Sequence, residues 1–395
     1  MKMKILVCDY LGIALQFIEE NFLKDRYEIV GVITPPRQDR ENPFDLLLKN
    51  SEWDYLLVFD NGVNRKNFDA TFQFLGISDE KIIYAMNPAS WLYKPEVGIH
   101  LANPTTYNGS LLYNQSLFTL ARNSNRYITC TTAENLSYLA TSGDSAVMYN
   151  TYVRRKTWAA DDMDLFHRLT KKYYDIDDSS GYFCDWGANI GTTGIYFLKQ
   201  LTPNLKLLAF EPDKENYKLL RINLLLNELE EKAVTENCGL GMEESEENFY
   251  RVEHNPGGSG MFANVYLSSI NMEVEPEKIK IIPPDKYLVE KNISPEEIKY
   301  IWIDTEGFEA QVILGAKNLL EKNPAPIFME FNPGAWNKSG LYEPMTEFLS
   351  RHYESYILVQ EAEKTDSPNL YPIEKLLEFK ERTEQIGDIF LIRKK

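Results

Sequence analysis

The sequence predicts an α/β protein in which short strands alternate with helices in two Rossmann-like parts. Three observations lead to this prediction. Apolar, strand-like segments alternate with segments of helical periodicity in both halves of the chain. A glycine-containing turn at residues 187–191 joins a strand to a helix, which is where open α/β sheets bind their ligands. Carboxylates follow several of the expected core strands, so they should gather at one edge of the sheet.

The composition limits the class of protein. The chain has 395 residues, 44% hydrophobic and 13% aromatic, so we expect two or three globular domains. The net charge of −17 argues against nucleic acid and against anionic membrane surfaces, because both select basic proteins. No apolar run is as long as a membrane span, and the run after Lys4 is too short for a secretory signal core. We therefore expect a cytoplasmic protein, with a homodimer as one alternative for its assembly.

The cysteines and histidines predict no metal site. The chain has 4 of each, spread widely and without a C-x-x-C pair. We expect the cysteines to be buried free thiols and predict no zinc.

The first 95 residues are predicted to form a small parallel doubly wound domain. Strands are expected at residues 4–10, 28–33, 55–59 and 81–84, and helices at 11–23, 44–49 and 65–75. The first strand-to-helix turn contains Gly12 alone, whereas a nucleotide loop needs several glycines. A structural or recognition role is therefore favoured over nucleotide binding. This part resembles the degenerate Rossmann-like modules attached to sugar-modifying enzymes.

Residues 96–180 are predicted to be a partly helical connector. Turn-forming pairs recur along it, and residues 161–173 have the pattern of an amphipathic helix. Four aromatic and basic residues before this helix either line a site or serve packing and the surface: Tyr152, Arg154, Arg155 and Trp158.

The turn Gly187-Ala188-Asn189-Ile190-Gly191 is the main candidate for a ligand site. It follows a strand-like segment and precedes a helix expected at residues 192–200. Its glycines allow a sharp turn and the close approach of a ligand. The alternative, a dinucleotide loop, has the pattern G-x-G-x-x-G with phosphate at the helix start. Here Asp185 precedes Gly187 by two residues, and a carboxylate disfavours pyrophosphate. It favours a ligand with positive charge, such as S-adenosylmethionine, which has a sulfonium and an ammonium group.

A second carboxylate supports the same cofactor. The next strand, residues 206–210, ends at Glu211, 26 positions after Asp185 (211 − 185). A carboxylate there can accept hydrogen bonds from both ribose hydroxyls, as acidic residues do in dinucleotide folds. The alternative for Asp185 alone is a turn-capping aspartate. The predicted cofactor-binding residues are Asp185, Gly187, Ala188, Asn189, Gly191 and Glu211.

The remaining segments continue the alternation. Strands are expected at residues 233–238, 299–303, 327–329, 355–359 and 388–393, and helices at 214–227, 310–320 and 343–352. A loop with a helix separates the last two strands, so they can pair antiparallel. The glycine-rich loop at residues 255–261 is either a linker or a lid over the substrate.

Together these motifs resemble the FkbM-type family of S-adenosylmethionine-dependent methyltransferases. The resemblance covers about residues 180–393 and rests on residues 185–191, 210–212, 303–309 and 314–316. It implies a seven-stranded Rossmann-like methyltransferase sheet with helices on both faces, in a domain spanning residues 181–395. It also implies O-methylation, commonly of a hydroxyl in a sugar, glycan or glycosylated natural product. The sequence departs from the family at Trp302, where lysine is usual, and at Trp186, where an aliphatic residue is usual.

Methyl transfer to a hydroxyl requires alignment of the reactants and a group that accepts the hydroxyl proton. Three carboxylates end core strands on the side where Asp185 and Glu211 also lie, and we predict that they form the catalytic group: Asp304, Glu306 and Glu330. Helix capping is the alternative for Glu306 and, more strongly, for Glu309. The three carboxylates can also hold a divalent cation, but only their clustering supports one, so no metal is predicted.

A protein of a different class is the alternative reading of the whole chain. The departure at Trp302 and the degenerate first domain favour an inactive methyltransferase-fold protein that binds or assembles components of glycan biosynthesis. The presence of both Asp185 and Glu211 favours the enzyme. The expected partner of that enzyme is a small-molecule or glycan acceptor.

Overall fold

The computed structural model describes residues 3–9, 27–33, 52–59, 72–73, 75–78, 81–84, 114, 117–119, 121–122, 125–252, 255–263, 274–365, 367–382 and 387–394. The chain forms two compact units. The first comprises Met1–Arg126 and Tyr152–Arg154, and the second comprises Tyr127–Thr151 and Arg155–Lys395. The predicted domain boundaries at residues 95 and 180 remain predictions.

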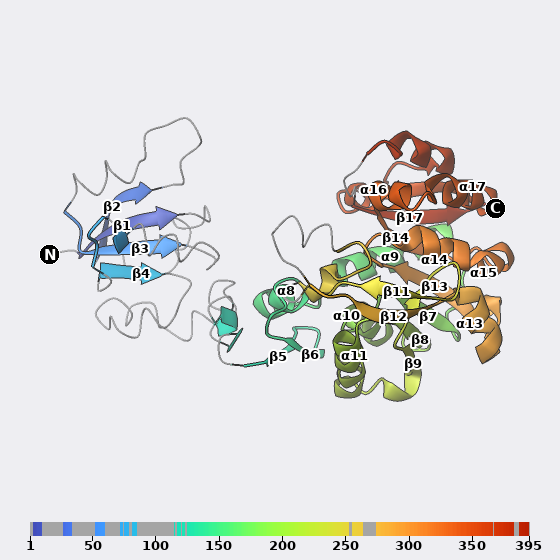
Figure 1. Ribbon diagram of the computed structural model, residues 1–395, viewed down its shortest axis with the longest axis horizontal. Coiled ribbons are helices and arrows are strands. Elements are labelled where there is room, and N and C mark those ends of the chain that lie inside the picture. Colours follow the sequence, from blue (N-terminus) through green and yellow to red (C-terminus); the bar gives the residue numbers. More distant parts are fainter. Residues whose placement is uncertain are drawn as a thin grey trace. The chain divides into compact units, whose positions relative to one another are not determined.

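The first unit contains a parallel sheet of four strands in the order β2-β1-β3-β4 (Figure 1). The strands are β1 (Met3–Asp9), β2 (Tyr27–Ile33), β3 (Tyr55–Phe59) and β4 (Ile82–Tyr84). Apolar side chains such as Leu6, Leu56 and Val58 form its core. The predicted parallel strands are thus confirmed. The helices predicted at residues 11–23, 44–49 and 65–75 lie wholly or largely outside the described residues.

The second unit is organised around a mixed sheet in the order β16-β15-β17-β14-β13-β7-β8-β9 (Figure 1). Its strands are β7 (Tyr182–Trp186), β8 (Lys206–Phe210), β9 (Ala233–Glu236), β13 (Ile298–Ile303), β14 (Ile327–Phe331), β15 (Tyr353–Leu358), β16 (Tyr371–Pro372) and β17 (Gly387–Arg393). The five strands from β14 to β9 run parallel. The strand β17 is antiparallel to both β14 and β15, as the sequence predicts for the last two strands.

The sheet has eight strands where seven were predicted. The additional strand is β16, which pairs with the edge of β15 over two residues. A pair of residues this short has no periodicity that a sequence pattern can reveal. The other seven strands all fall within or beside the predicted segments.

Apolar cores cover both faces of this sheet. One face packs against α9 (Ala160–Tyr173), α10 (Thr192–Tyr196) and α11 (Lys214–Leu226). The other packs against α13 (Pro284–Lys291), α14 (Glu309–Gly315), α15 (Lys317–Lys322) and α17 (Tyr342–His352). Helices on both faces were predicted. Among the described residues, no helix is long and apolar enough to cross a membrane.

The segment between the two predicted domains contains a hairpin that the sequence did not reveal. Its strands β5 (Tyr127–Thr131) and β6 (Ser137–Thr141) pair antiparallel, and α8 (Val147–Arg154) follows. Asn223 of α11 and Asn227, the residue after this helix, hold β6 in place. The Asn223 side chain binds the N–H and C=O of Leu139, and the Asn227 side chain binds those of Ser137. These amides therefore replace a neighbouring strand for β6.

Trp302, the departure from the family pattern, is a core residue. It stacks on Phe328 with ring centroids 4.4 Å apart and an interplanar angle of 18°. Phe166 of α9 contacts both rings. On the neighbouring strand β7, the residue opposite Trp302 is Asp185. The four cysteines are buried and free, as predicted.

Candidate active site

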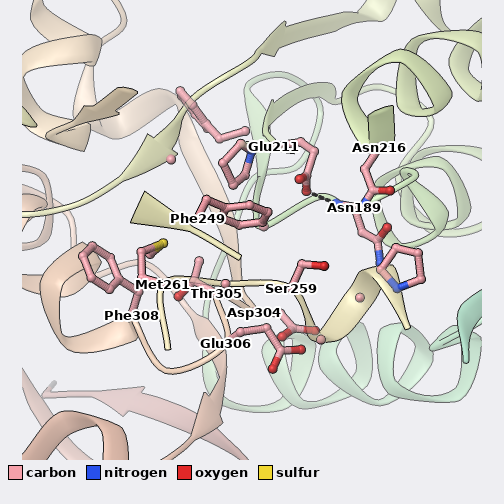
Figure 2. A pocket seen from close by; sticks show the side chains of 18 of the residues that line it. Asn189, Glu211, Asn216, Phe249, Ser259, Met261, Asp304, Thr305, Glu306 and Phe308 are labelled. Carbon is pink, nitrogen blue, oxygen red and sulfur yellow. Dashed lines mark hydrogen bonds between the residues drawn. The ribbon is translucent and has the colours of Figure 1, made fainter. Parts of the chain in front are cut away.

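A cavity of about 210 Å³ lies where β7, β8 and β13 end (Figure 2). Its wall is formed by Ala146, Val147, Trp158, Gly187, Asn189, Phe210, Glu211, Pro212, Asn216, Gly239, Leu240, Phe249, residues 255–261, Asp304, Thr305, Glu306 and Phe308. Three of these lining residues are acidic and none is basic. The cavity therefore favours a ligand that carries positive charge and hydrogen-bond donors.

The glycine turn brings the backbones of three strands together at the cavity. Gly187 and Ala188 donate their N–H groups to the carbonyl of Phe210, at 3.1 and 2.9 Å. Asp304 donates its N–H to the carbonyl of Trp186 at 3.0 Å. Gly187 has a φ of +97°, and a Cβ there would lie 1.8 Å from the Asp304 carbonyl oxygen. Glycine is thus required by the approach of the β13 backbone, before any ligand is considered.

Asp185 is buried below the turn and does not line the cavity. Its Oδ2 accepts hydrogen bonds from the Thr193 hydroxyl at 2.6 Å and from the Gly194 N–H at 3.0 Å. These bonds join β7 to α10, which agrees with the capping alternative. Burial raises the pKa of Asp185 to about 6. Its Oδ1 has no hydrogen-bond partner in the protein. A direct contact between Asp185 and a cofactor remains a prediction.

Gly191 also lies outside the cavity wall. Its φ is +87°, and a Cβ would lie 2.5 Å from a methyl carbon of Leu220 on α11. Close packing between the turn and α11 therefore accounts for this glycine. Ala188 is buried as well and does not line the cavity.

Glu211, Asn189 and Asn216 present polar groups to the cavity (Figure 2). The Glu211 carboxylate accepts hydrogen bonds from the N–H groups of Asn189 and Asp213, each at 2.7 Å. Burial, followed by the nearby charge of Asp213, raises the pKa of Glu211 to about 8. The Oδ1 atoms of Asn189 and Asn216 are buried and have no hydrogen-bond partner. The sequence predicted Asn189 and Glu211 as site residues, but it did not single out Asn216.

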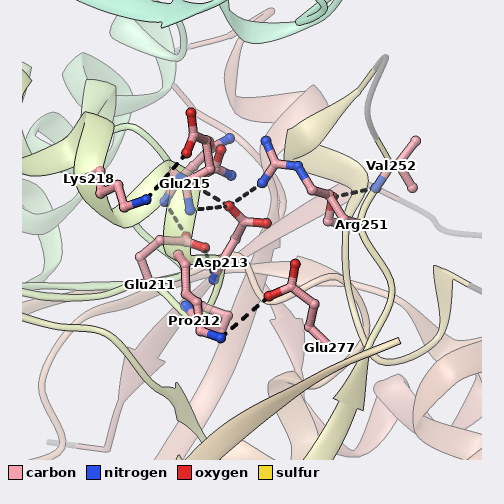
Figure 3. Close-up of polar contacts among 12 residues, drawn as sticks. Glu211, Pro212, Asp213, Glu215, Lys218, Arg251, Val252 and Glu277 are labelled. Atoms are coloured by element: carbon pink, nitrogen blue, oxygen red, sulfur yellow. Dashed lines mark hydrogen bonds and ion pairs between the residues drawn. The ribbon is translucent and has the colours of Figure 1, made fainter. Parts of the chain in front are cut away.

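An ion pair between Asp213 and Arg251 braces this wall (Figure 3). Asp213 caps α11, because its side chain accepts hydrogen bonds from the N–H groups of Glu215 and Asn216. Arg251 follows β11 (Ser245–Phe249). This strand belongs to a smaller sheet in the order β10-β12-β11, with β10 at Gly239–Leu240 and β12 at Glu277–Ile282. An aspartate before a helix is a recognisable capping signal. No local pattern indicates Arg251, because its partner is distant in the sequence.

Glu309 holds together the loop that carries Asp304 and Glu306. It is fully buried, and its Oε1 accepts hydrogen bonds from the Thr305 N–H at 3.1 Å, the Thr305 hydroxyl at 2.9 Å and the Gly307 N–H at 3.0 Å. Its Oε2 accepts one from Trp336 Nε1 at 2.8 Å. One carboxylate oxygen therefore binds the loop, and the other binds the helix α16 (Pro333–Lys338). Glu309 thus has a structural role in the loop before α14, and α14 has no side-chain capping bond of the kind that the alternative expected.

Asp304 and Glu306 line the cavity, and Glu330 lies outside its wall. Burial raises the pKa of Asp304 to about 7 and that of Glu306 to about 9, and neighbouring carboxylates add to both shifts. Glu306 has a φ of +54° and shows no capping bond to α14. Glu330 is 5% exposed, its Oε2 has no hydrogen-bond partner, and burial raises its pKa well above the ordinary range.

The glycine-rich loop forms one side of the cavity. It contains the short turn η4 (Pro256–Gly258), and the Ser259 hydroxyl accepts a hydrogen bond from the Val252 N–H at 2.9 Å. A Cβ on Gly260 would lie 3.2 Å from Glu306 Cβ. Trp158 also lines the cavity, whereas Tyr152, Arg154 and Arg155 do not. The loop lies where a lid would act, and opening and closing remain predictions.

The described residues include no group of three or more histidine, cysteine or acidic side chains arranged to hold a metal ion. The carboxylates at the sheet edge are therefore not preassembled as a metal site within this part of the chain.

Part of this chain is similar to known methyltransferases. Residues 185–356 match the family described as the methyltransferase FkbM domain. Methyltransferase sdnD from Sordaria araneosa is 26% identical over 204 residues, covering 46% of this chain and 76% of that protein. Two solved structures overlap more loosely. Methyltransferase FkbM from Methylobacillus flagellatus is 13% identical, with a TM-score of 0.32 over 88% of this chain and 84% of that chain. An O-methyltransferase from Thermotoga maritima is 10% identical, with a TM-score of 0.32 over 65% and 73%.

Proposed function

Because this chain is a methyltransferase of the FkbM family, we propose that its cavity binds S-adenosylmethionine and that it methylates a hydroxyl oxygen. The proposed acceptor is a sugar, a glycan or a glycosylated natural product. The observation that carries the proposal is the position of Glu211, which ends β8, lines the cavity and lies beside the glycine turn. When bound, the cofactor supplies a methyl group on a sulfonium leaving group.

The cavity wall fits the polar groups of this cofactor. Each oxygen of Glu211 accepts one backbone N–H and keeps capacity for a second donor, such as a ribose hydroxyl. The unpartnered Oδ1 atoms of Asn189 and Asn216 are further acceptors for hydroxyl or amino groups. The acidic wall also suits the net positive charge of the cofactor.

Asp304 is the proposed proton acceptor. Its carboxylate ends β13 at the cavity, and its pKa of about 7 suits a base that works near neutral pH. Glu306 has a higher pKa, so it is better suited to donate a hydrogen bond to the acceptor. Glu330 lies outside the cavity wall, and burial raises its pKa well above its ordinary value.

Trp302, which favoured the alternative of an inactive protein, does not weaken this proposal. Trp302 is 6% exposed and packs between Phe328 and Phe166, so it removes no group from the cavity wall. Glu211 and Asp304 both face the cavity, as an active enzyme requires.

Titration and turnover measurements on two variants test the proposal. Glu211→Gln should weaken S-adenosylhomocysteine binding at least tenfold, because it removes charge-assisted hydrogen bonds to the ribose. Asp304→Asn should keep that affinity and lower methyl transfer to sugar hydroxyls about a hundredfold. Isothermal titration and detection of methylated sugars by mass spectrometry give both quantities. Absence of cofactor binding by the wild-type protein would overturn the proposal, and unchanged turnover of Asp304→Asn would remove this base.

A further inference from the structure

Three carboxylates form a row across neighbouring strands beside the cavity. Glu330 on β14 lies directly opposite Asp388 on β17. Ile303 lies opposite Met329, so the next residues, Asp304 and Glu330, are level with each other. Neighbouring strands are about 4.8 Å apart, and residues opposite each other point to the same face. We call Asp304, Glu330 and Asp388 the acidic row.

Aromatic side chains lie beneath the acidic row. Two residues away along the same strands, Trp302 is opposite Phe328, and Phe328 is opposite Phe390. All three belong to the core beneath α9. Within the row, Glu330 is buried and Asp388 is half-buried, whereas Asp304 is exposed at the cavity. Burial raises the pKa of Asp388 to about 8.

The acidic row has no positive partner among the described residues. None of its members forms a salt bridge with a described lysine, arginine or histidine. The further groups that act on the row are also acidic: Glu309, Glu306, Asp162 and Glu363. Acidic groups this close raise one another's pKa, and the buried Glu330 Oε2 lacks any hydrogen-bond donor. The row therefore needs a ligand that brings both positive charge and donors.

We propose that the acidic row binds a protonated amine of the methyl acceptor, so that the substrate is an amine-bearing hydroxyl compound such as an amino sugar. The inference rests on the proposed function, because the acceptor hydroxyl must lie near Asp304. An ammonium has three donors, which match three carboxylates better than a neutral hydroxyl does. Asp304 belongs to both the cavity wall and the row. The amine and the methylated hydroxyl thus lie on the order of one or two strand spacings apart, about 5–10 Å.

Sugar binding to the protein saturated with S-adenosylhomocysteine tests this inference. Glucosamine carries the ammonium, N-acetylglucosamine has the same ring with a neutral amide, and glucose has a hydroxyl at that position. We expect glucosamine to bind at least tenfold more tightly than the other two in isothermal titration with a chelator present. Asp388→Asn should reduce this preference to less than threefold without changing the affinity for S-adenosylhomocysteine, because Asp388 lies outside the cavity wall.

A matched variant and a metal control complete the experiment. Glu347→Gln removes one negative charge from the exposed face of α17 and should leave the glucosamine preference intact. Failure of glucosamine to bind, equal binding of the three sugars, or an unchanged preference in Asp388→Asn would each overturn the inference. Tighter binding of Mg²⁺ than of glucosamine, lost in Asp388→Asn, would assign the row to a metal instead. If S-adenosylhomocysteine itself fails to bind, the proposed function fails first, so the two failures are distinguishable.

Discussion

The bond between Glu309 and Trp336 allows a quantitative test of how the acidic loop is held. Glu309→Gln can keep its three bonds to Thr305 and Gly307 through the amide oxygen. The amide nitrogen must then face Trp336 Nε1–H, so that two donors oppose each other. Burial prevents water from satisfying either donor. We expect the free energy of unfolding to fall by about 2–3 kcal/mol.

Trp336→Phe perturbs the same bond from the other side. It leaves the buried Glu309 Oε2 without a donor, which also costs about 2–3 kcal/mol. In the double variant the Trp336 donor is absent, so the two donors no longer oppose each other. The side-chain NH2 of Gln at position 309 then remains as the one group without an acceptor. Its expected loss is about 3 kcal/mol, compared with about 5 kcal/mol for the sum of the single changes. The coupling free energy is therefore about 2 kcal/mol.

Urea unfolding followed by circular dichroism measures the four proteins of this cycle. A matched control replaces Trp186 by Phe, because Trp186 is also buried but its Nε1 has no hydrogen-bond partner. Combined with Glu309→Gln, this control should be additive within about 0.5 kcal/mol. Additivity within the same margin for Trp336→Phe would refute the role assigned to the Glu309–Trp336 bond.

Two further predictions concern the cavity wall. Gly187→Ala should prevent the second unit from folding stably, because the new Cβ would lie 1.8 Å from the Asp304 carbonyl oxygen. Gly340 is the control, since it has a positive φ of +71° but no atom within 4 Å of a Cβ position. Gly340→Ala should lower the free energy of unfolding by only about 1–2 kcal/mol. Equal thermal midpoints for these variants would contradict the reasoning. The affinity for adenosine should rise about tenfold between pH 6.5 and 8.5, because ribose hydroxyls bind the ionised Glu211 and the pKa of that group in the free protein is about 8. Isothermal titration should show that the adenosine affinity of Glu211→Gln does not change with pH. An adenosine affinity of the wild-type protein that also does not change with pH would exclude Glu211 as the titrating group.

Local sequence patterns predicted the parts of the site that depend on one strand and the turn after it. The strand ends at Phe210 and Ile303 were placed correctly, because apolar runs followed by acidic residues mark them. Glu211 and Asp304, which follow these strands, line the cavity in the structure. What each side chain binds depends on distant residues, and no local pattern contains that information.

Asp185 and Glu309 illustrate this limit. Both were recognised as acids beside a turn. Asp185 binds a backbone N–H of the helix that follows it, whereas Glu309 binds backbone N–H groups of the loop that precedes it. Whether a carboxylate faces the cavity or turns inward depends on which N–H groups the folded backbone leaves unpaired. Arg251 and the asparagines that hold β6 were missed for the same reason, since their partners lie far away in the sequence.

The acidic row and the proposed base are connected by the same electrostatics. An isolated aspartate, with a pKa near 4, is a weak base for a hydroxyl proton. Burial, followed by the negative charge of Glu309 and other carboxylates, raises the pKa of Asp304 to about 7. Glu306 has a higher pKa of about 9, so it stays protonated while Asp304 ionises. A cationic group on the row would lower the pKa of Asp304 and ionise it as the acceptor binds. Under the proposed function, binding an amine thus prepares the base at the moment when the hydroxyl arrives, which a neutral sugar cannot do.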